Sequence, residues 1–316
     1  MLSNFIQTKY RVITMSYNRP SIGLVLSGGG ARGLAHIGVL RVLEREGIPV
    51  KYLAGTSMGG LIAAGYASGM SSYDLEEVAR VAVQKRHMLR MMDPGLPNGG
   101  VIRGQGILKF YKQLFGEKTF SDLRLPLAVV AVDLNTYQEV VLKTGSVAMA
   151  LRATTSLPGV FMPLMMNGMK LTDGGVLNNL PVDAAQSMGA ERIIAIDIAM
   201  NDHHWIGRWM AGHHWVPKGV TQTLEVIDDT IYALRIAEQR HKLQHFPPDV
   251  LISPDLPGNV NTFVGYSQVS ELIEAGERAT ENYLQEIKAL VDPCSQRFCK
   301  QADNNQDSPV SGRFIV

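Results

Sequence analysis

The chain is poor in cysteine, has no long apolar run and carries almost no net charge. Each absence excludes a class of structure or function. Only two of the 316 residues are cysteines, Cys294 and Cys299, so a disulfide framework is excluded for the core and a reducing compartment is expected. No window approaches the roughly 20 apolar residues needed to span a bilayer. The formal net charge of +1 gives no field that would recruit nucleic acid.

Both ends of the chain differ in character from its middle. The first 20 residues mix polar and apolar side chains and lack the compact apolar stretch of a signal peptide. They predict an N-terminal extension over 1–20, with translation starting at Met1 or Met15. A cytoplasmic location is expected, including peripheral contact with the inner face of a membrane. The polar residues after Pro293 predict a disordered tail over 293–316.

Apolar runs and helical patterns alternate between these ends. Buried strands are predicted for four short apolar runs, at 22–26, 50–54, 126–133 and 192–198. The alternation of strands with helices indicates an α/β fold with a mainly parallel central sheet covered on both faces. We expect a core over 21–200 and a helical C-terminal part over 201–292 that packs on the same domain. Two amphipathic helices are predicted in that part, at 221–244 and 267–290.

A G-x-S-x-G sequence runs from Gly55 to Gly59, between a predicted strand and a predicted helix. A sharp strand-to-helix turn of this kind holds its serine in a strained conformation with the hydroxyl exposed. The positive end of the following helix favours a nucleophile that becomes more anionic. The pattern therefore predicts that Ser57 is a nucleophile, while a purely structural turn remains the alternative.

The glycine-rich stretch Gly28–Gly33 has two interpretations. It matches G-x-G-x-x-G after a strand, which is typical of a dinucleotide-binding turn. It also suits an oxyanion hole, where clustered backbone N–H groups face a developing negative charge. The dinucleotide interpretation needs an acidic residue at the end of the second strand, but Glu44 and Glu46 precede that strand and Gly55 and Ser57 follow it. The oxyanion hole is therefore favoured.

Asp173, Gly174 and Gly175 follow a short predicted strand. Aspartate followed by glycine is a strong turn signal, so a plain turn is one interpretation. The other makes Asp173 the general base that accepts the proton of a nucleophile such as Ser57.

These three motifs in this order resemble the patatin-like phospholipase family, which includes the catalytic domains of neuropathy-target-esterase-like proteins. Weaker similarities lie at 27–40, 133–136 and 173–182, and the resemblance covers about 180 residues, from Ser21 to Ala199. It implies a three-layer α/β/α patatin-like fold whose core over 21–200 is catalytic. It further implies a serine–aspartate dyad without histidine.

The resemblance also assigns roles to individual residues. Ser57 would attack an ester carbonyl and form an acyl-enzyme, and Asp173 would act as base and then activate water. The oxyanion would be held by backbone N–H groups within the set Gly28, Gly29, Gly30 and Ala31. The remaining motif residues would support these loops: Arg32, Gly33, Gly55, Gly59, Gly174 and Gly175. The expected activity is cleavage of carboxylic esters of lipids, of the phospholipase A or lysophospholipase type, without cofactor or metal.

Three alternatives remain open at this stage. A Ser-Asp-His triad fits the chain order, because six histidines follow Asp173: His203, His204, His213, His214, His241 and His245. His36, on the first helix, is expected to be a packed or capping residue. A regulatory or interaction protein could retain the fold with little turnover. An NAD-binding oxidoreductase is disfavoured by the missing acidic residue.

The segment 201–219 contains all three tryptophans and four of the eight histidines. Tryptophan favours the boundary between water and lipid, because its ring is apolar and its N–H is polar. We therefore expect peripheral membrane contact through Trp205, Trp209 and Trp215, with a lipid or acyl ester as the substrate. The histidines could instead bind zinc, but only Asp202 accompanies them as an acidic ligand.

Overall fold

The computed structural model describes residues 19–84, 86–87, 91, 93–94, 100–199, 218–260 and 265–292. The tryptophan residues, the predicted tail over 293–316 and nearly all of the predicted N-terminal extension lie outside these residues.

Strands and helices alternate through the first two thirds of the chain, as predicted. The strands are β1 (Ile22–Leu26), β2 (Val50–Thr56), β3 (Gly100–Ile102), β4 (Leu127–Asp133), β5 (Gln138–Leu142), β6 (Gly159–Phe161), β7 (Leu164–Met166), β8 (Met169–Asp173), β9 (Arg192–Ile196) and β10 (Val250–Ile252). The α-helices are α1 (Ala35–Arg45), α2 (Met58–Ala67), α3 (Ser72–Ala82), α5 (Gln105–Phe115), α6 (Val147–Thr154), α7 (Val182–Ser187), α9 (Lys218–His245), α10 (Val269–Asn282) and α11 (Leu284–Val291). Short 3₁₀ helices include η1 (Gly30–Leu34) and η3 (Gly174–Val176).

The central sheet is mixed, with a parallel part and an antiparallel part. Strands β10, β9, β1, β2 and β4 lie side by side in parallel. Beyond them β8 pairs antiparallel with β4, and β7 pairs antiparallel with β8. Strand β5 pairs with the other edge of β4. The predicted parallel sheet is therefore present and is extended by antiparallel strands.

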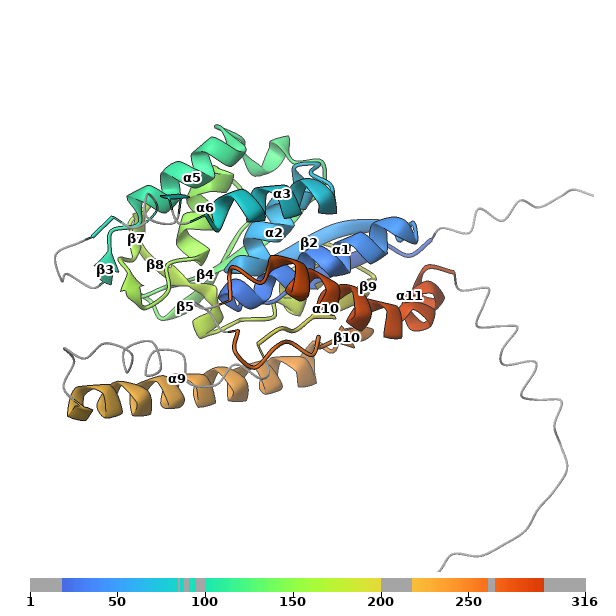
Figure 1. The fold of residues 1–316 in the computed structure, drawn as a ribbon. Helices are drawn as coiled ribbons and strands as arrows, with labels where there is room; N and C mark the ends of the chain where they lie inside the picture. The colour runs from blue at the N-terminus through green and yellow to red at the C-terminus, as the bar shows by residue number, and fades with distance from the viewer. Residues whose placement is uncertain are drawn as a thin grey trace, which may run out of the picture.

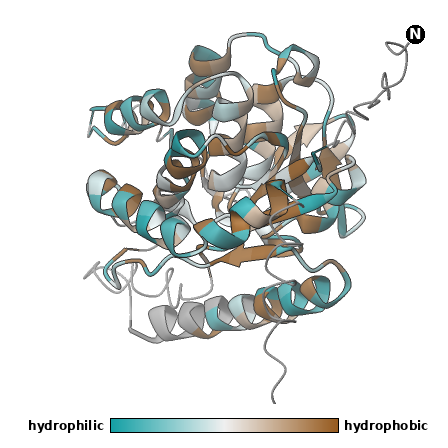
Figure 2. Ribbon diagram, turned by 90° about the vertical axis from the view of Figure 1, so that its right-hand side faces the viewer, coloured by the Kyte–Doolittle hydropathy of each residue, from teal (hydrophilic) through white to brown (hydrophobic). Residues whose placement is uncertain are grey.

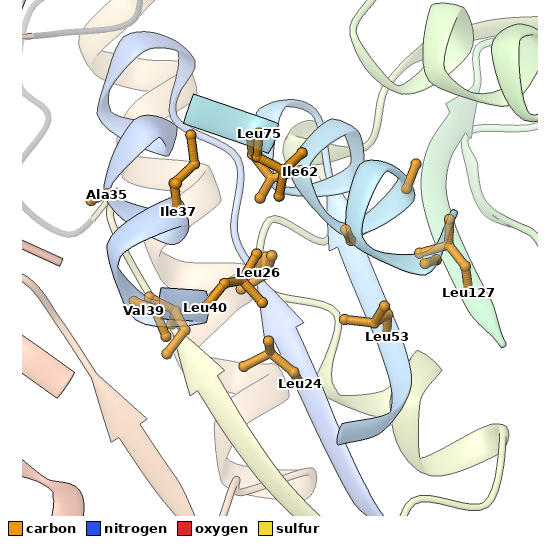
Figure 3. Close-up of a cluster of buried hydrophobic side chains, with 14 of the residues drawn as sticks. Leu24, Leu26, Ala35, Ile37, Val39, Leu40, Leu53, Ile62, Leu75 and Leu127 are labelled. Atoms are coloured by element: carbon orange, nitrogen blue, oxygen red, sulfur yellow. The ribbon is translucent and has the colours of Figure 1, made fainter. Parts of the chain in front are cut away.

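Alternate residues of the central strands enter two separate apolar clusters, one on each face of the sheet. Leu24, Leu26 and Leu53 pack with helices α1 and α2, as Figure 3 shows. Their neighbours Val25 and Ala54 belong to the second cluster, which includes apolar residues of α7. Helices thus cover both faces, which confirms the α/β/α layers expected from the resemblance (Figure 1). Hydrophobic colour in Figure 2 is concentrated on the strands between them, and hydrophilic colour on the outer helical surfaces.

Several element boundaries differ from the sequence-based expectation. The helix predicted over 267–290 is two helices, α10 and α11, which meet at Tyr283. The strand predicted over 50–54 continues to Thr56, and α2 begins at Met58. Ser57 is therefore the single residue between strand and helix, a tighter turn than the sequence pattern indicated.

Helices α1 and α10 contact each other through two glycines. A Cβ atom placed on Gly38 would lie 1.9 Å from the carbonyl oxygen of Ile273, and one on Gly276 would lie 1.9 Å from that of Ala35. Neither position has room for a methyl group, so the two backbones approach as closely as glycine permits. This contact joins the start of the core to the C-terminal helices.

We expect Gly276→Ala to lower the free energy of unfolding by about 1–3 kcal/mol, because overpacking against a backbone oxygen outweighs the better helix propensity of alanine. The matched control is Gly258→Ala, since no atom of the described residues lies within 4 Å of a Cβ at that position. It should change stability by less than about 1 kcal/mol. Urea unfolding followed by circular dichroism measures both. A wild-type stability for Gly276→Ala would show that the α1–α10 contact is looser than described.

Candidate active site

Strand register brings the ends of β2 and β8 together on one edge of β4. Thr56, the last residue of β2, pairs with Val130 of β4. The next residue of β4, Ala131, pairs with Asp173 at the end of β8. Because β5 occupies the opposite edge of β4 over the same stretch, β8 continues on the edge that β2 leaves. Ser57 and Asp173 therefore meet at this junction.

Ser57 has a backbone conformation that few residues other than glycine adopt. Its φ is 52° and its ψ is −122°, in the turn between β2 and α2. Non-glycine residues held in such sparsely populated regions cost about 1–3 kcal/mol and persist only where their surroundings fix them. The strained turn matches the geometry that a nucleophile on a G-x-S-x-G turn requires.

Thr154 is one group that fixes this turn. The backbone N–H of Ser57 donates a 2.8 Å hydrogen bond to the Thr154 hydroxyl, which itself donates to the carbonyl oxygen of Val130. Thr154 is fully buried at the end of α6. Its hydroxyl thus joins the turn to the sheet at the point where β2 ends. Sequence reasoning did not single out Thr154, because no motif marks it.

Asp173 is buried, and its carboxyl accepts hydrogen bonds. Its Oδ1 accepts a 2.8 Å hydrogen bond from the backbone N–H of Gly175. The side chain of Ser57 is a further hydrogen-bond partner. Burial raises the pKa of the Asp173 carboxyl, while the bonds from Ser57 and Gly175 and the positive charge of Arg235 act in the opposite direction. The carboxyl is therefore a stronger base than a solvent-exposed aspartate.

The glycine-rich loop lies directly against the serine turn. A Cβ on Gly28 would lie 3.0 Å from the Cβ of Ser57, and one on Gly33 would lie 2.2 Å from Cγ of Met58. Gly30 has a φ of 55° and begins the 3₁₀ helix η1, at whose start backbone N–H groups lack intrahelical partners. Among the described residues, no backbone hydrogen bond is donated by the N–H of Gly29 or Gly30. The loop therefore has N–H groups available beside Ser57.

Two polar side chains hold this loop to neighbouring strands and turns. The guanidinium of Arg32 is buried and donates a 2.6 Å hydrogen bond from Nε to the carbonyl oxygen of Ile198, just beyond β9. Asn179 donates from Nδ2 to the carbonyl oxygen of Gly28 at 3.2 Å. Because Asn179 follows the turn that begins at Asp173, it joins the glycine-rich loop to that turn.

The remaining motif glycines stand where backbones touch. A Cβ on Gly59 would lie 2.2 Å from the carbonyl oxygen of Leu26, and one on Gly174 would lie 2.3 Å from that of Val130. At Gly55 the nearest atom would be a backbone carbon of Gly59 at 2.7 Å. The glycines of the three motifs thus let the chain segments of the site approach one another.

The described histidines do not form a triad with Ser57 and Asp173. His36 is fully buried, contacts the carbonyl oxygen of Ser27 through Nε2 at 2.9 Å, and has its pKa lowered to about 4 by burial. It is therefore a packed, neutral residue, as the sequence suggested. His241 and His245 are exposed on α9. The other candidates lie outside the described residues: His203, His204, His213 and His214.

Two features are absent from the described residues, a cluster of metal-binding side chains and a membrane-spanning helix. No group of three or more histidine, cysteine, aspartate or glutamate side chains there could hold a metal ion. No helix in that part of the chain is both long and apolar enough to cross a membrane.

Comparison with known proteins places these motifs in one family. A family model described as patatin-like phospholipase matches residues 24–186. The chain is 39% identical over 188 residues to patatin-like phospholipase domain-containing protein 6 of Mus musculus, 34% identical over 209 residues to neuropathy target esterase sws of Drosophila melanogaster, and 34% identical over 181 residues to an uncharacterized NTE family protein of Mycobacterium bovis. These alignments cover 58%, 62% and 57% of this chain.

The chain spans only part of these relatives. It covers 14% of the mouse protein, 15% of the Drosophila protein and 49% of the Mycobacterium protein. The matched segment contains all three motifs, from Gly28 to Gly175, and ends before α9.

We expect Thr154→Val to weaken the serine turn, because valine keeps the shape of threonine but leaves the Ser57 N–H without an acceptor. An unsatisfied buried donor costs about 1–3 kcal/mol, which urea unfolding will show. The Thr154→Ser variant retains the hydroxyl and should lose less stability. A larger loss in Thr154→Ser than in Thr154→Val would mean that the methyl group, and not the hydroxyl, supports the turn.

Proposed function

The chain belongs to the patatin-like phospholipase family, and we propose that it is a serine acyl hydrolase that cleaves carboxylic esters of lipids. The observation that carries the proposal is the meeting of Ser57 and Asp173 at the β2–β8 junction, beside the glycine-rich loop. The names of the relatives, a phospholipase and an esterase, support an ester of a lipid as the substrate class.

In the first half of the proposed reaction, the Ser57 hydroxyl attacks the ester carbonyl carbon and gives its proton to the Asp173 carboxylate. The carbonyl oxygen becomes an oxyanion in the tetrahedral intermediate. Collapse of this intermediate breaks the bond to the alcohol oxygen, which leaves with the proton held by Asp173. The acyl group remains on Ser57 as an ester.

In the second half, water attacks the acyl-enzyme while Asp173 accepts one of its protons. The bond between the acyl carbon and Ser57 Oγ breaks, and Oγ recovers that proton from Asp173. A free carboxylic acid is released. Asp173 thus serves as base and then as acid in each half, so both dyad residues return to their starting state.

We propose that the oxyanion is bound by backbone N–H groups within the set Gly28, Gly29, Gly30 and Ala31. The proximity of Gly28 to Ser57 and the free N–H groups at the start of η1 support this assignment. Donors fixed in advance at the position of developing charge are typically the largest single contribution to catalysis of acyl transfer. The side chains of Arg32 and Asn179 hold the loop in place for this purpose.

We expect Ser57→Ala to abolish labelling by a fluorophosphonate probe and to lower ester turnover by several orders of magnitude, because no nucleophile remains. Asp173→Asn should retain weak labelling, since the amide cannot accept the proton. Gel fluorescence and hydrolysis of a nitrophenyl ester measure the two effects.

The matched control for the nucleophile is Ser187→Ala, at the end of α7, where the serine hydroxyl donates only to the carbonyl oxygen of Ala184. This variant should label like the wild type. Circular dichroism confirms that each variant is folded. Persistent labelling of folded Ser57→Ala would assign the nucleophile to another residue.

We also propose that the protein is cytoplasmic and touches the inner face of a membrane through Trp205, Trp209 and Trp215. The support is the preference of tryptophan for the water–lipid boundary, since these residues lie outside the described part of the chain. Replacing all three by alanine should lower the fraction bound in liposome flotation severalfold. Unchanged flotation would remove the proposed membrane contact without affecting the proposed dyad.

A further inference from the structure

One face of α9 presents polar side chains to the catalytic layer. Helix α9 lies on the side of the molecule opposite α3 and α5, and contacts η3, the short helix that follows Asp173 (Figure 1). Arg235, Gln239 and Lys242 are spaced by four and three residues along it, so they share one face of the helix. We call these three residues the α9 stripe, and two of them, Gln239 and Lys242, contact acidic residues.

Two members of the stripe fasten α9 to the core. Gln239 is buried and donates a hydrogen bond from Nε2 to Oδ2 of Asp197, just beyond β9. Lys242 pairs with Asp183 at 2.8 Å and with Glu139. Asn178 donates to the same two carboxylates, at 2.8 and 2.9 Å. Because Asn178 follows the Asp173 turn, the helix is joined to the segment that holds the base.

The third member, Arg235, faces the base itself. A Cβ point built on Gly175 lies 3.5 Å from Nη2 of Arg235 and 3.1 Å from Oδ1 of Asp173. The guanidinium and the carboxylate therefore lie near the same point, beside a residue that has no side chain, and Oδ1 of Asn179 lies 2.8 Å from that point. Nε of Arg235 is buried and has no hydrogen-bond partner in the described part of the chain.

We propose that Arg235 is a positioning residue of the dyad, a cation carried by α9 that keeps the carboxylate of Asp173 charged until it accepts the serine proton. This inference rests on the proposed function, because it assigns a role within that dyad. It adds a residue beyond the segment matched by the family model, which ends at 186.

The physical need for such a cation follows from the burial of Asp173. Desolvation disfavours a charged carboxylate, and the groups that otherwise face Asp173, the Ser57 hydroxyl and the Gly175 N–H, are neutral donors. Tyr111 of α5 also interacts electrostatically with Asp173, but burial raises the pKa of Tyr111 to about 12 and it stays neutral. Arg235 therefore supplies the positive charge in this set.

The positive charge of Arg235 also acts on a second carboxylate, that of Asp197. Asp197 is buried, and burial raises its pKa while its hydrogen bonds with Ala199 and Gln239 and the charges of Arg235 and Arg32 oppose that change. Because Arg32 also acts on Asp197, loss of Arg235 leaves Asp197 with one cation. Loss of Arg235 leaves Asp173 without a cation in this set, so we expect a larger rise in the pKa of Asp173 than of Asp197.

The test compares the pH dependence of kcat/KM for wild type, Arg235→Gln, Arg235→Lys and Arg240→Gln on a neutral short-chain nitrophenyl ester. Removing the cation raises the pKa of Asp173, so the acidic limb of the Arg235→Gln profile should move to higher pH. Activity should fall about tenfold on that limb and recover at alkaline pH. Arg235→Lys keeps a charge and should regain much of the loss.

Arg240→Gln is the matched control, because it removes the same charge from an exposed position of the same helix. Its profile should match the wild type. A uniform loss at every pH in Arg235→Gln, or an increase in KM alone, would overturn the proposal in favour of a packing or substrate-binding role. The neutral substrate removes any effect of an anionic head group from this comparison.

A second readout does not depend on turnover. Carbon-13 NMR of aspartate-labelled protein follows the titration of Asp173, assigned with Asp173→Asn. A higher midpoint in Arg235→Gln than in wild type supports the inference even if no ester is cleaved, and an unchanged midpoint overturns it. Absence of turnover and labelling in folded wild type would instead contradict the proposed function, so the two failures are distinguishable.

Discussion

The structure of the candidate site depends on one exchange of neighbours along β4. Where β2 ends at Thr56, β8 takes its place on the same edge of β4, beginning with the pair Ala131–Asp173. A strand that ends inside a sheet leaves its next residue, Ser57, in the turn above the edge. The strand that replaces it runs antiparallel and brings Asp173 to the same level. The hydrogen-bond register between the strands thus sets the positions of Ser57 and Asp173 relative to each other.

This junction is crowded, and the crowding determines both its composition and its electrostatics. Backbone segments from β1, β2, β4 and β8 approach so closely that a methyl group at Gly28, Gly59 or Gly174 would overlap a neighbour. The same close packing removes water from Asp173 and makes its charge costly. The site therefore needs compensation from hydrogen bonds and from an opposite charge, and the structure provides both in the Gly175 N–H and Arg235.

The segment matched by the family model ends before the last elements that surround the site. Helix α10 packs on α1 through paired glycines, and α9 reaches the Asp173 turn through Lys242 and Asn178. These contacts come from helices outside the three motifs, and they stabilise the layer that bears the motifs. The turns that bear the motifs thus rely on charges and packing supplied by α9 and α10, which come later in the chain.

The sequence alone was sufficient for the local features. Apolar runs identified β1, β4 and β9, and the Gly55–Gly59 pattern identified the serine turn, because strand burial and tight turns restrict which residue types can occupy each position. The roles of Thr154, Asp197 and Arg235 came only from the tertiary structure. Each lies far from Ser57 in sequence. None carries a local sequence signal, because side chains with a hydroxyl, carboxylate or guanidinium group also occur on solvated surfaces. Their significance depends on burial and on distance to a partner, and both are set by how the sheet and helices pack.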